Sequence, residues 1–194
     1  MIDLAYIKDE MMVHIPICTH KEPSKVLVLG DMDLDLEINK HSCIKDVKSI
    51  SSNFMDSLSS METGSFDIII NSIENLSSDK ALLDEVVRVL SPKGVISSES
   101  SNMLSQAIAF ENELKAWGDK FKIVMPYKYE ASQGAIVTSN NLLLLSHTYH
   151  PTADINLQRA DLTDGLKYYN SDIAIGAFHL STVIRKRFLG LVKL

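Results

Sequence analysis

The residues of this chain best suited to chemistry are three aspartates that follow a short apolar run. The run covers residues 26–29, and after Gly30 come Asp31, Asp33 and Asp35. Where a buried strand hands over to a helix, glycine lets the backbone approach a nucleotide-type ligand, and helix N–H groups favour an anion. Carboxylates at this place attract ammonium groups instead. The turn therefore indicates a cationic or uncharged nucleoside ligand, such as a sulfonium compound with a free amine. The alternative is a polar turn that binds nothing.

Composition limits the classes of partner. The chain has 194 residues, a net charge of -6 and a pI near 5.5. This length predicts a single domain over residues 1–194 with a sizeable core. An acidic chain argues against nucleic acid or an anionic membrane as partner, because both select a basic surface. Cationic small molecules remain compatible with this charge.

Cysteine usage and the N-terminal residues indicate a compartment. Cys18 and Cys43 are the two cysteines, and their spacing matches neither a metal site nor a disulfide framework. The start lacks a basic region followed by a long apolar one, and the apolar run 142–145 is far too short to span a bilayer. We therefore expect a cytoplasmic protein with no bound metal and no membrane association.

Short apolar runs alternate with helical patterns along the chain. Such alternation predicts an α/β fold with a mostly parallel sheet. The predicted strands cover residues 25–30, 47–50, 66–71, 94–98 and 122–125.

Two helices and one hairpin are well marked. A helix capped by Asp79 carries apolar residues at helical spacing as far as Leu90, and a second covers residues 103–118 with a buried apolar stripe. Residues 135–138 and 142–146 predict two strands joined by a turn at residues 139–141. Helices on both faces and a C-terminal antiparallel hairpin are typical of a Rossmann-like, methyltransferase-type sheet.

Two motifs resemble one enzyme family. The segment Leu166-Lys167-Tyr168-Tyr169-Asn170, followed by Ala177-Phe178, is similar to the terminal L-[KR]-Y-Y-N and A-F-x-L-P motifs of the spermidine synthases, the polyamine aminopropyltransferases. Near the other end, residues 9–16 (DEMMVHIP) and 25–30 (KVLVLG) resemble the family's H-E-M-L-x-H-x-P and K-V-L-x-x-G motifs.

The resemblance extends through the middle of the chain. Residues 66–74 (FDIIINSIE) are similar to the family's F-D-V-I-I-x-D-S-x-D segment, and residues 132–134 fall where it has P-S-G. The order and spacing agree from end to end. Because the chain starts just before the H-E-M helix, we expect the family's small N-terminal β domain to be absent.

The resemblance implies transfer of an aminopropyl group from decarboxylated S-adenosylmethionine to putrescine, with release of methylthioadenosine. An amine attacks the methylene next to a sulfonium, so an ammonium of pKa near 10 must first lose a proton. A carboxylate can accept that proton, and no permanent cofactor is needed.

The family's catalytic carboxylate falls on Glu74, which is the expected base. The other acid of that loop falls on Asn71, which can form hydrogen bonds but cannot neutralise an amine. In the donor site, the family's G-G-G-D-G-G lies over residues 30–35. Gly30 and Asp33 match it, and Asp33 corresponds to the aspartate that holds the donor amine.

Other donor-site positions differ from the family pattern. Asp31 replaces a glycine, and its side chain would fill space near the ligand. The position of the family's acidic residue that binds the ribose hydroxyls falls on Ser51. Residues 53–66 leave room for a helix but not for the strand and N-G-D-A segment that cover adenine, so we expect one edge strand to be missing.

The acceptor site is assigned by the same correspondence. Asp9 stands where the family has the histidine of the H-E-M motif, Tyr127 and Tyr129 lie near its polyamine-contacting tyrosine, and Gly134 matches the glycine of P-S-G. The expected partners are a putrescine-like amine and a second copy of the chain. His14 is expected to pack against the sheet.

Two other functions stay open. One is a family member without catalysis that acts as a binding or interaction protein. The other is an S-adenosylmethionine-dependent methyltransferase built on the same sheet.

Overall fold

The structure, a computed structural model, describes residues 5–133 and 136–194. Its centre is a six-stranded sheet in the order β2-β1-β3-β4-β6-β5. The strands are β1 (Lys25–Leu29), β2 (Asp46–Ile50), β3 (Phe66–Asn71), β4 (Leu90–Glu99), β5 (Ile123–Gln133) and β6 (Ile136–Ser146).

The sheet topology confirms the predicted class. Strands β1 to β4 pair in parallel, whereas β6 runs antiparallel to both β4 and β5. Between β2 and β3, residues 51–65 carry the helix α3 (Phe54–Ser59) and no strand, so β2 is the edge of the sheet. The expected loss of one edge strand is confirmed.

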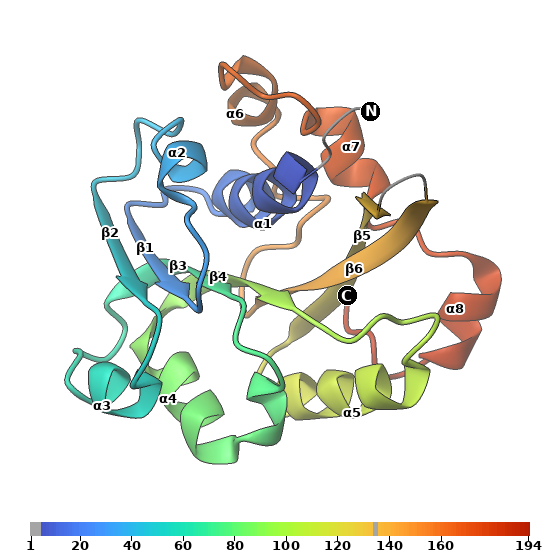
Figure 1. Ribbon diagram of the computed structural model, residues 1–194, viewed down its shortest axis with the longest axis horizontal. Coiled ribbons are helices and arrows are strands. Elements are labelled where there is room, and N and C mark those ends of the chain that lie inside the picture. The colour runs from blue at the N-terminus through green and yellow to red at the C-terminus, as the bar shows by residue number, and fades with distance from the viewer. Residues whose placement is uncertain (1–4, 134–135) are drawn as a thin grey trace.

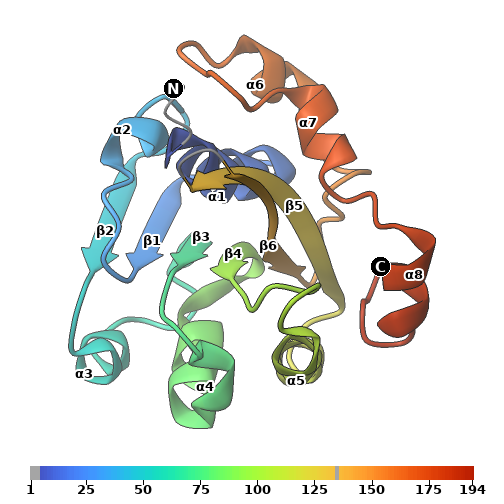
Figure 2. The same ribbon diagram turned by 45° about the vertical axis from the view of Figure 1, so that its right-hand side comes forward.

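Helices cover both faces of the sheet (Figures 1 and 2). α1 (Ala5–Thr19), α2 (Asp35–Ile38), α6 (Leu157–Leu162) and α7 (Ser171–Gly176) lie on one face, and α3, α4 (Lys80–Val89) and α5 (Ala107–Gly118) on the other. A short 3₁₀ turn (Leu76–Ser78) precedes α4, and α8 (Thr182–Arg187) follows α7 near the C-terminus. None of the described helices is long and apolar enough to cross a bilayer.

Alternating side chains of the strands divide the core in two. In β1, Val26 and Val28 pack under α1, whereas Leu27 and Leu29 pack with α4 and α5. Successive side chains of a strand point to opposite faces, and burial of both explains the continuous apolar runs.

The predicted hairpin turn is in the wrong place. Residues 139–141 do not form a turn but lie inside β6, and the partner strand of β6 is β5. The reason is tertiary: the side chain of Asn141 is buried and binds the loop after β4, so this asparagine serves a sheet rather than a turn.

Two further boundaries differ from the prediction. The second helix begins at Ala107 rather than at 103, because Asn102 Oδ1 accepts the backbone N–H groups of Leu104 and Ser105 and holds a loop there. Leu104 is consequently exposed rather than part of the buried stripe. Strand β5 continues beyond Met125, since Pro126 is tolerated in an edge strand.

Candidate functional site

The register of the parallel strands brings predicted site residues together at the carboxyl edge of the sheet. Leu29 pairs with Ile50 and with Asn71, and Asn71 pairs with Ser98. The residues that follow form a row in the order Ser51, Gly30, Ser72, Glu99. With about 4.8 Å between neighbouring strands, this row is about 14 Å wide. Ligands of open α/β sheets bind at this edge.

A side chain at position 30 would clash with Ser72, the next residue in the row. Gly30 has a φ of +113°, and a Cβ placed there would lie 2.0 Å from the hydroxyl of Ser72. That hydroxyl donates to the Leu29 carbonyl at 3.1 Å. The glycine therefore makes room for an internal side chain at the centre of the row.

The acidic turn after β1, residues 31–35, has one buried side chain and three exposed aspartates. Asp31, Asp33 and Asp35 are exposed, whereas Leu34 is buried beneath α1. Leu34 therefore anchors the turn while the carboxylates face solvent, where a cation can reach them.

Asn71 has internal partners for both polar atoms of its side chain. Its amide donates to Ser98 Oγ at 2.9 Å, and its oxygen accepts the N–H of Ile73 at 3.1 Å. The side chain is 1% exposed. Asn71 thus ties β3 to β4 and shapes the loop that carries Glu74.

A cavity of about 310 Å³ opens at the carboxyl ends of β3 and β4 and contains Glu74, Glu99 and Glu113. Glu99 pairs with Lys8 at 2.5 Å, and Glu113 accepts from the N–H and hydroxyl of Ser101. Burial raises the pKa of Glu113, and the bonds from Ser101 oppose this rise. Within the described residues Glu74 has no hydrogen-bond or ion-pair partner, so its carboxylate is the free one.

Acidic groups from separate elements also gather around Asp9 of α1. Burial raises the pKa of Asp9; Lys8 lowers it, while repulsion by Glu37 and Asp33 raises it further. Burial raises the pKa of Tyr129 to about 12, with smaller contributions from Glu99 and Asp9. The structure thus brings Asp9 near Asp33 and near Tyr129, and the local charge favours a cation.

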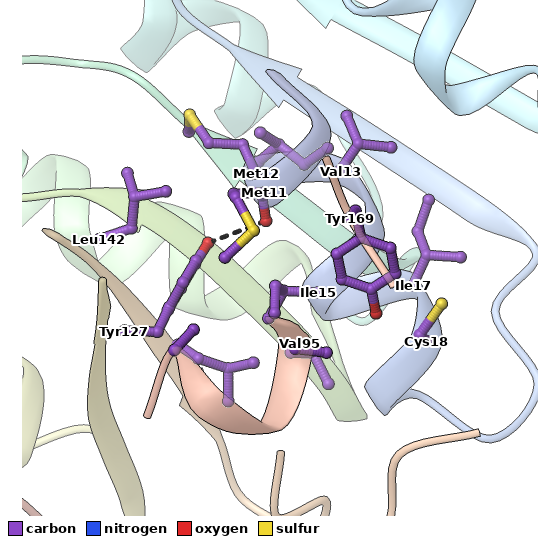
Figure 3. Close-up of a cluster of buried hydrophobic side chains, with 14 of the residues drawn as sticks. Met11, Met12, Val13, Ile15, Ile17, Cys18, Val95, Tyr127, Leu142 and Tyr169 are labelled. Atoms are coloured by element: carbon purple, nitrogen blue, oxygen red, sulfur yellow. Dashed lines mark hydrogen bonds between the residues drawn. The ribbon is translucent and has the colours of Figure 1, made fainter. Parts of the chain in front are cut away.

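The two predicted tyrosines occupy different surroundings. Tyr127 is completely buried, and its hydroxyl forms a hydrogen bond with Ser97 Oγ at 2.6 Å. The same hydroxyl donates to the Met11 carbonyl at 3.3 Å (Figure 3). It is a core residue in this structure. Tyr129 is 9% exposed and lines a separate hollow with Tyr168. Gly134 lies outside the described residues.

Residues that the sequence interpretation missed include Lys8, Glu99 and Glu113. Glu99 directly follows the predicted strand 94–98, and an acid at the carboxyl end of a parallel strand is a signal that could have identified it. Lys8 reaches the site from a helix distant in sequence and Glu113 from the helix that follows β4, and no local pattern marks either residue. No group of three or more His, Cys, Asp or Glu in the described residues could hold a metal ion.

Glu10 joins the two motifs at the ends of the chain. It is completely buried, and its carboxylate accepts the backbone N–H groups of Lys167, Tyr168 and Tyr169 at 2.8–2.9 Å. Glu10, in the motif at residues 9–16, therefore holds the backbone of the motif at residues 166–170. Both motifs thus contribute to the stability of the fold.

Comparison with known proteins agrees with this arrangement. The sequence model of the family described as "Spermine/spermidine synthase domain" matches residues 5–52. The polyamine aminopropyltransferase of Helicobacter acinonychis (strain Sheeba) is 26% identical over 199 residues, which cover 90% of this chain and 74% of that protein.

Solved structures share the fold. A spermidine synthase in complex with the transition state analogue AdoDATO has a TM-score of 0.84 at 19% identity, covering 97% of this chain and 76% of that one. The spermidine synthase from Thermotoga maritima has a TM-score of 0.82 at 19% identity, with 97% and 75% covered. The motifs at both ends, the sheet order and these matches together confirm the resemblance of this chain to the spermine/spermidine synthase family, at low sequence identity.

Proposed function

We propose that this protein transfers an aminopropyl group from decarboxylated S-adenosylmethionine to a putrescine-like amine. The observation that carries the proposal is the unpaired carboxylate of Glu74 in a cavity at the carboxyl edge of the sheet. The names of the related proteins, polyamine aminopropyltransferase and spermidine synthase, support it.

The proposed reaction is a single displacement with one proton transfer to the protein. The amine nitrogen attacks the methylene carbon beside the sulfonium; the new C–N bond forms as the C–S bond breaks, and methylthioadenosine leaves with the electron pair. Glu74 takes the proton that frees the amine's lone pair. A positioned base of this kind contributes about 10²- to 10⁴-fold to the rate.

The proposed donor site lies along the row of strand ends. Asp33, with Asp9 beside it, binds the donor's ammonium group, while Gly30 and Ser51 border the nucleoside. Asp31 adds negative charge at the entrance. In the acceptor site, Asn71 holds the Glu74 loop in place, and Tyr129, whose pKa the charge of Glu99 raises, borders it from a separate hollow.

The test is release of methylthioadenosine from decarboxylated S-adenosylmethionine and putrescine. Because Glu74 is exposed, Glu74→Gln should fold normally and lower kcat by about 100-fold or more, in line with loss of a general base. Glu62→Gln, also an exposed glutamate, is the matched control and should keep full activity. Absence of product at high concentrations of the unmodified enzyme contradicts the proposal.

A second candidate is a family member that binds an amine without catalysis. Three observations favour it: Ser72 occupies the space beside Gly30, Asn71 is fully engaged, and the Lys8 ammonium already neutralises Glu99. This candidate predicts no turnover but a rise in melting temperature with putrescine. No rise with either putrescine or methylthioadenosine contradicts it.

We propose in addition a single domain, a homodimer and a cytoplasmic location. The single continuous sheet supports the first, and the free thiols of Cys18 and Cys43 are compatible with the last. Limited proteolysis, analytical ultracentrifugation and cell fractionation test these three statements in turn.

A further inference from the structure

A chain of hydrogen-bonded polar side chains, with two buried histidines, connects α1 to α2. His41 Nε2 lies 2.7 Å from His14 Nδ1, and His14 Nε2 lies 2.9 Å from Glu37 Oε2. Lys40 Nζ donates to both oxygens of Glu37 and to the carbonyl of Gly165. His14 is completely buried and His41 is 4% exposed, so the contact between the two rings is shielded from water, whereas Glu37 and Lys40 are partly exposed.

The proton positions in this chain follow from its chemistry. A carboxylate can only accept, so His14 donates from Nε2 to Glu37. Burial lowers the pKa of His14 to about 3, so its imidazole is neutral and Nδ1 carries no proton. His41 must then donate from Nε2 to His14. Each contact in the chain thus has one donor and one acceptor, and Lys40 balances the charge of Glu37.

These hydrogen-bonded side chains support α2, a helix that is too short to be stable by itself. α2 is a single turn, without a side-chain cap at its N-terminus. An isolated turn of helix is unstable, because its nucleation costs more than one hydrogen bond returns. Burial of Leu34 and Ile38 fixes one side of it, and the bond from His14 to Glu37 fixes its direction.

The acidic turn ends where α2 begins. Asp33 directly precedes the buried Leu34, and Glu37 lies three residues after Leu34, about one helical turn further on. Asp9 lies on the same helix as His14, and its carboxyl group feels the charges of both Glu37 and Asp33. The contact between His14 and Glu37 therefore sets the position of Asp33 relative to Asp9.

We infer that His14 is a positioning residue: by holding Glu37, it places Asp33 for the amine of the donor, without touching the ligand itself. This inference rests on the proposed function. The predicted packing of His14 against the sheet gave it no such role, since Glu37 becomes its neighbour only through the fold.

The experiment compares two ligands that differ by the aminopropyl group and by the positive charge of the sulfonium to which it is attached. Decarboxylated S-adenosylmethionine carries the ammonium group that Asp33 would hold, and methylthioadenosine does not. Isothermal titration calorimetry gives the Kd of each for the unmodified protein, His14→Gln and Glu37→Gln. We expect both variants to lose about tenfold in preference for the amine-bearing ligand, the loss expected for one weakened charge-assisted bond, with little change for methylthioadenosine.

His20→Gln is the matched control. His20 is also buried and follows directly after α1, but it lies outside the polar chain. It should keep the preference. Nitrogen shifts of the histidine side chains, measured without ligand, should report neutral Nε2–H tautomers for His14 and His41.

The outcomes separate this inference from the proposed function. Equal loss of affinity for both ligands, unchanged preference in His14→Gln, or Nδ1–H tautomers overturns the positioning role, even if turnover is normal. If the unmodified protein binds neither ligand and releases no product, the proposed function fails, and this role fails with it.

Discussion

The glutamates Glu10, Glu37 and Glu74 differ in the groups that donate hydrogen bonds to their carboxylates. Glu10 is saturated by backbone N–H groups, Glu37 by an imidazole and an ammonium group, and Glu74 by nothing in the described residues. A carboxylate whose oxygens already accept hydrogen bonds within the protein is held in place, whereas one without such partners is available to a substrate. The same side chain therefore serves structure at two positions and chemistry at the third.

Glu10→Gln should lower the free energy of unfolding by about 2–3 kcal/mol, because an amide group then faces backbone N–H donors that lose their acceptor. Oε1 accepts from Lys167 and Oε2 from Tyr168 and Tyr169, so neither orientation of the amide preserves every bond. Urea denaturation measures the change. The exposed Glu22→Gln is the control, and equal stability of the two variants would refute the structural role.

At the scale of elements, β6 connects the sheet to the cavity. Asn141 donates from its amide to Ser100 Oγ and to the Ser101 carbonyl, and its oxygen accepts the N–H of Met103. The strand thereby fixes the loop after β4, which contributes to the lining of the cavity. Strand β6, which has 11 residues and contains two asparagines, thus positions that loop.

Asn141→Asp should destabilise the protein by about 2 kcal/mol, since a carboxylate cannot donate to the Ser101 carbonyl. Thermal unfolding measures this, and hydrogen exchange should show faster exchange in residues 100–103. Asn140→Asp is the matched control, because the one bond donated by its amide is long, 3.4 Å to Thr138. If Asn140→Asp cost as much as Asn141→Asp, the assigned role would be wrong.

For the whole molecule, the buried imidazoles make stability depend on pH. Burial is the main cause that lowers the pKa of both His14 and His41 to about 3. In the unfolded chain a histidine has a pKa of about 6.5, so below that pH the unfolded state binds protons that the folded state refuses. The free energy of unfolding is therefore complete above about pH 6.5 and falls as the pH drops toward about 3.

The expected slope is about 1.4 kcal/mol per pH unit for each imidazole, or about 2.7 for both. Urea denaturation at a series of pH values measures it, and the double variant His14→Gln/His41→Gln should lose this part of the slope. Replacing the exposed His179 by glutamine should leave the slope unchanged. A double variant with the slope of the unmodified protein would argue against two neutral buried imidazoles.

Local pattern predicted most of the sheet and helices. Buried strands such as β1 and β3 are continuous apolar runs, and Asp79 caps α4 as its residue type indicates, by accepting the Leu82 N–H. Local pattern failed at Asn140 and Asn141, whose preference for turns was overridden by a contact with a loop about 40 residues earlier in the chain.

The sequence alone thus indicated the α/β class, the resemblance to one enzyme family and the acidic turn after the first strand, because apolar runs, caps and motifs are local. The tertiary structure decided which carboxylates are free. Lys8 meets Glu99, His14 meets Glu37, and Glu10 meets residues 167–169 only after folding. Charge and hydrogen bonding act over a few ångströms in space, whereas these partners are far apart in the chain. The acidic turn that begins the sequence argument therefore acquires its position, and its proposed use, from a helix that it does not belong to.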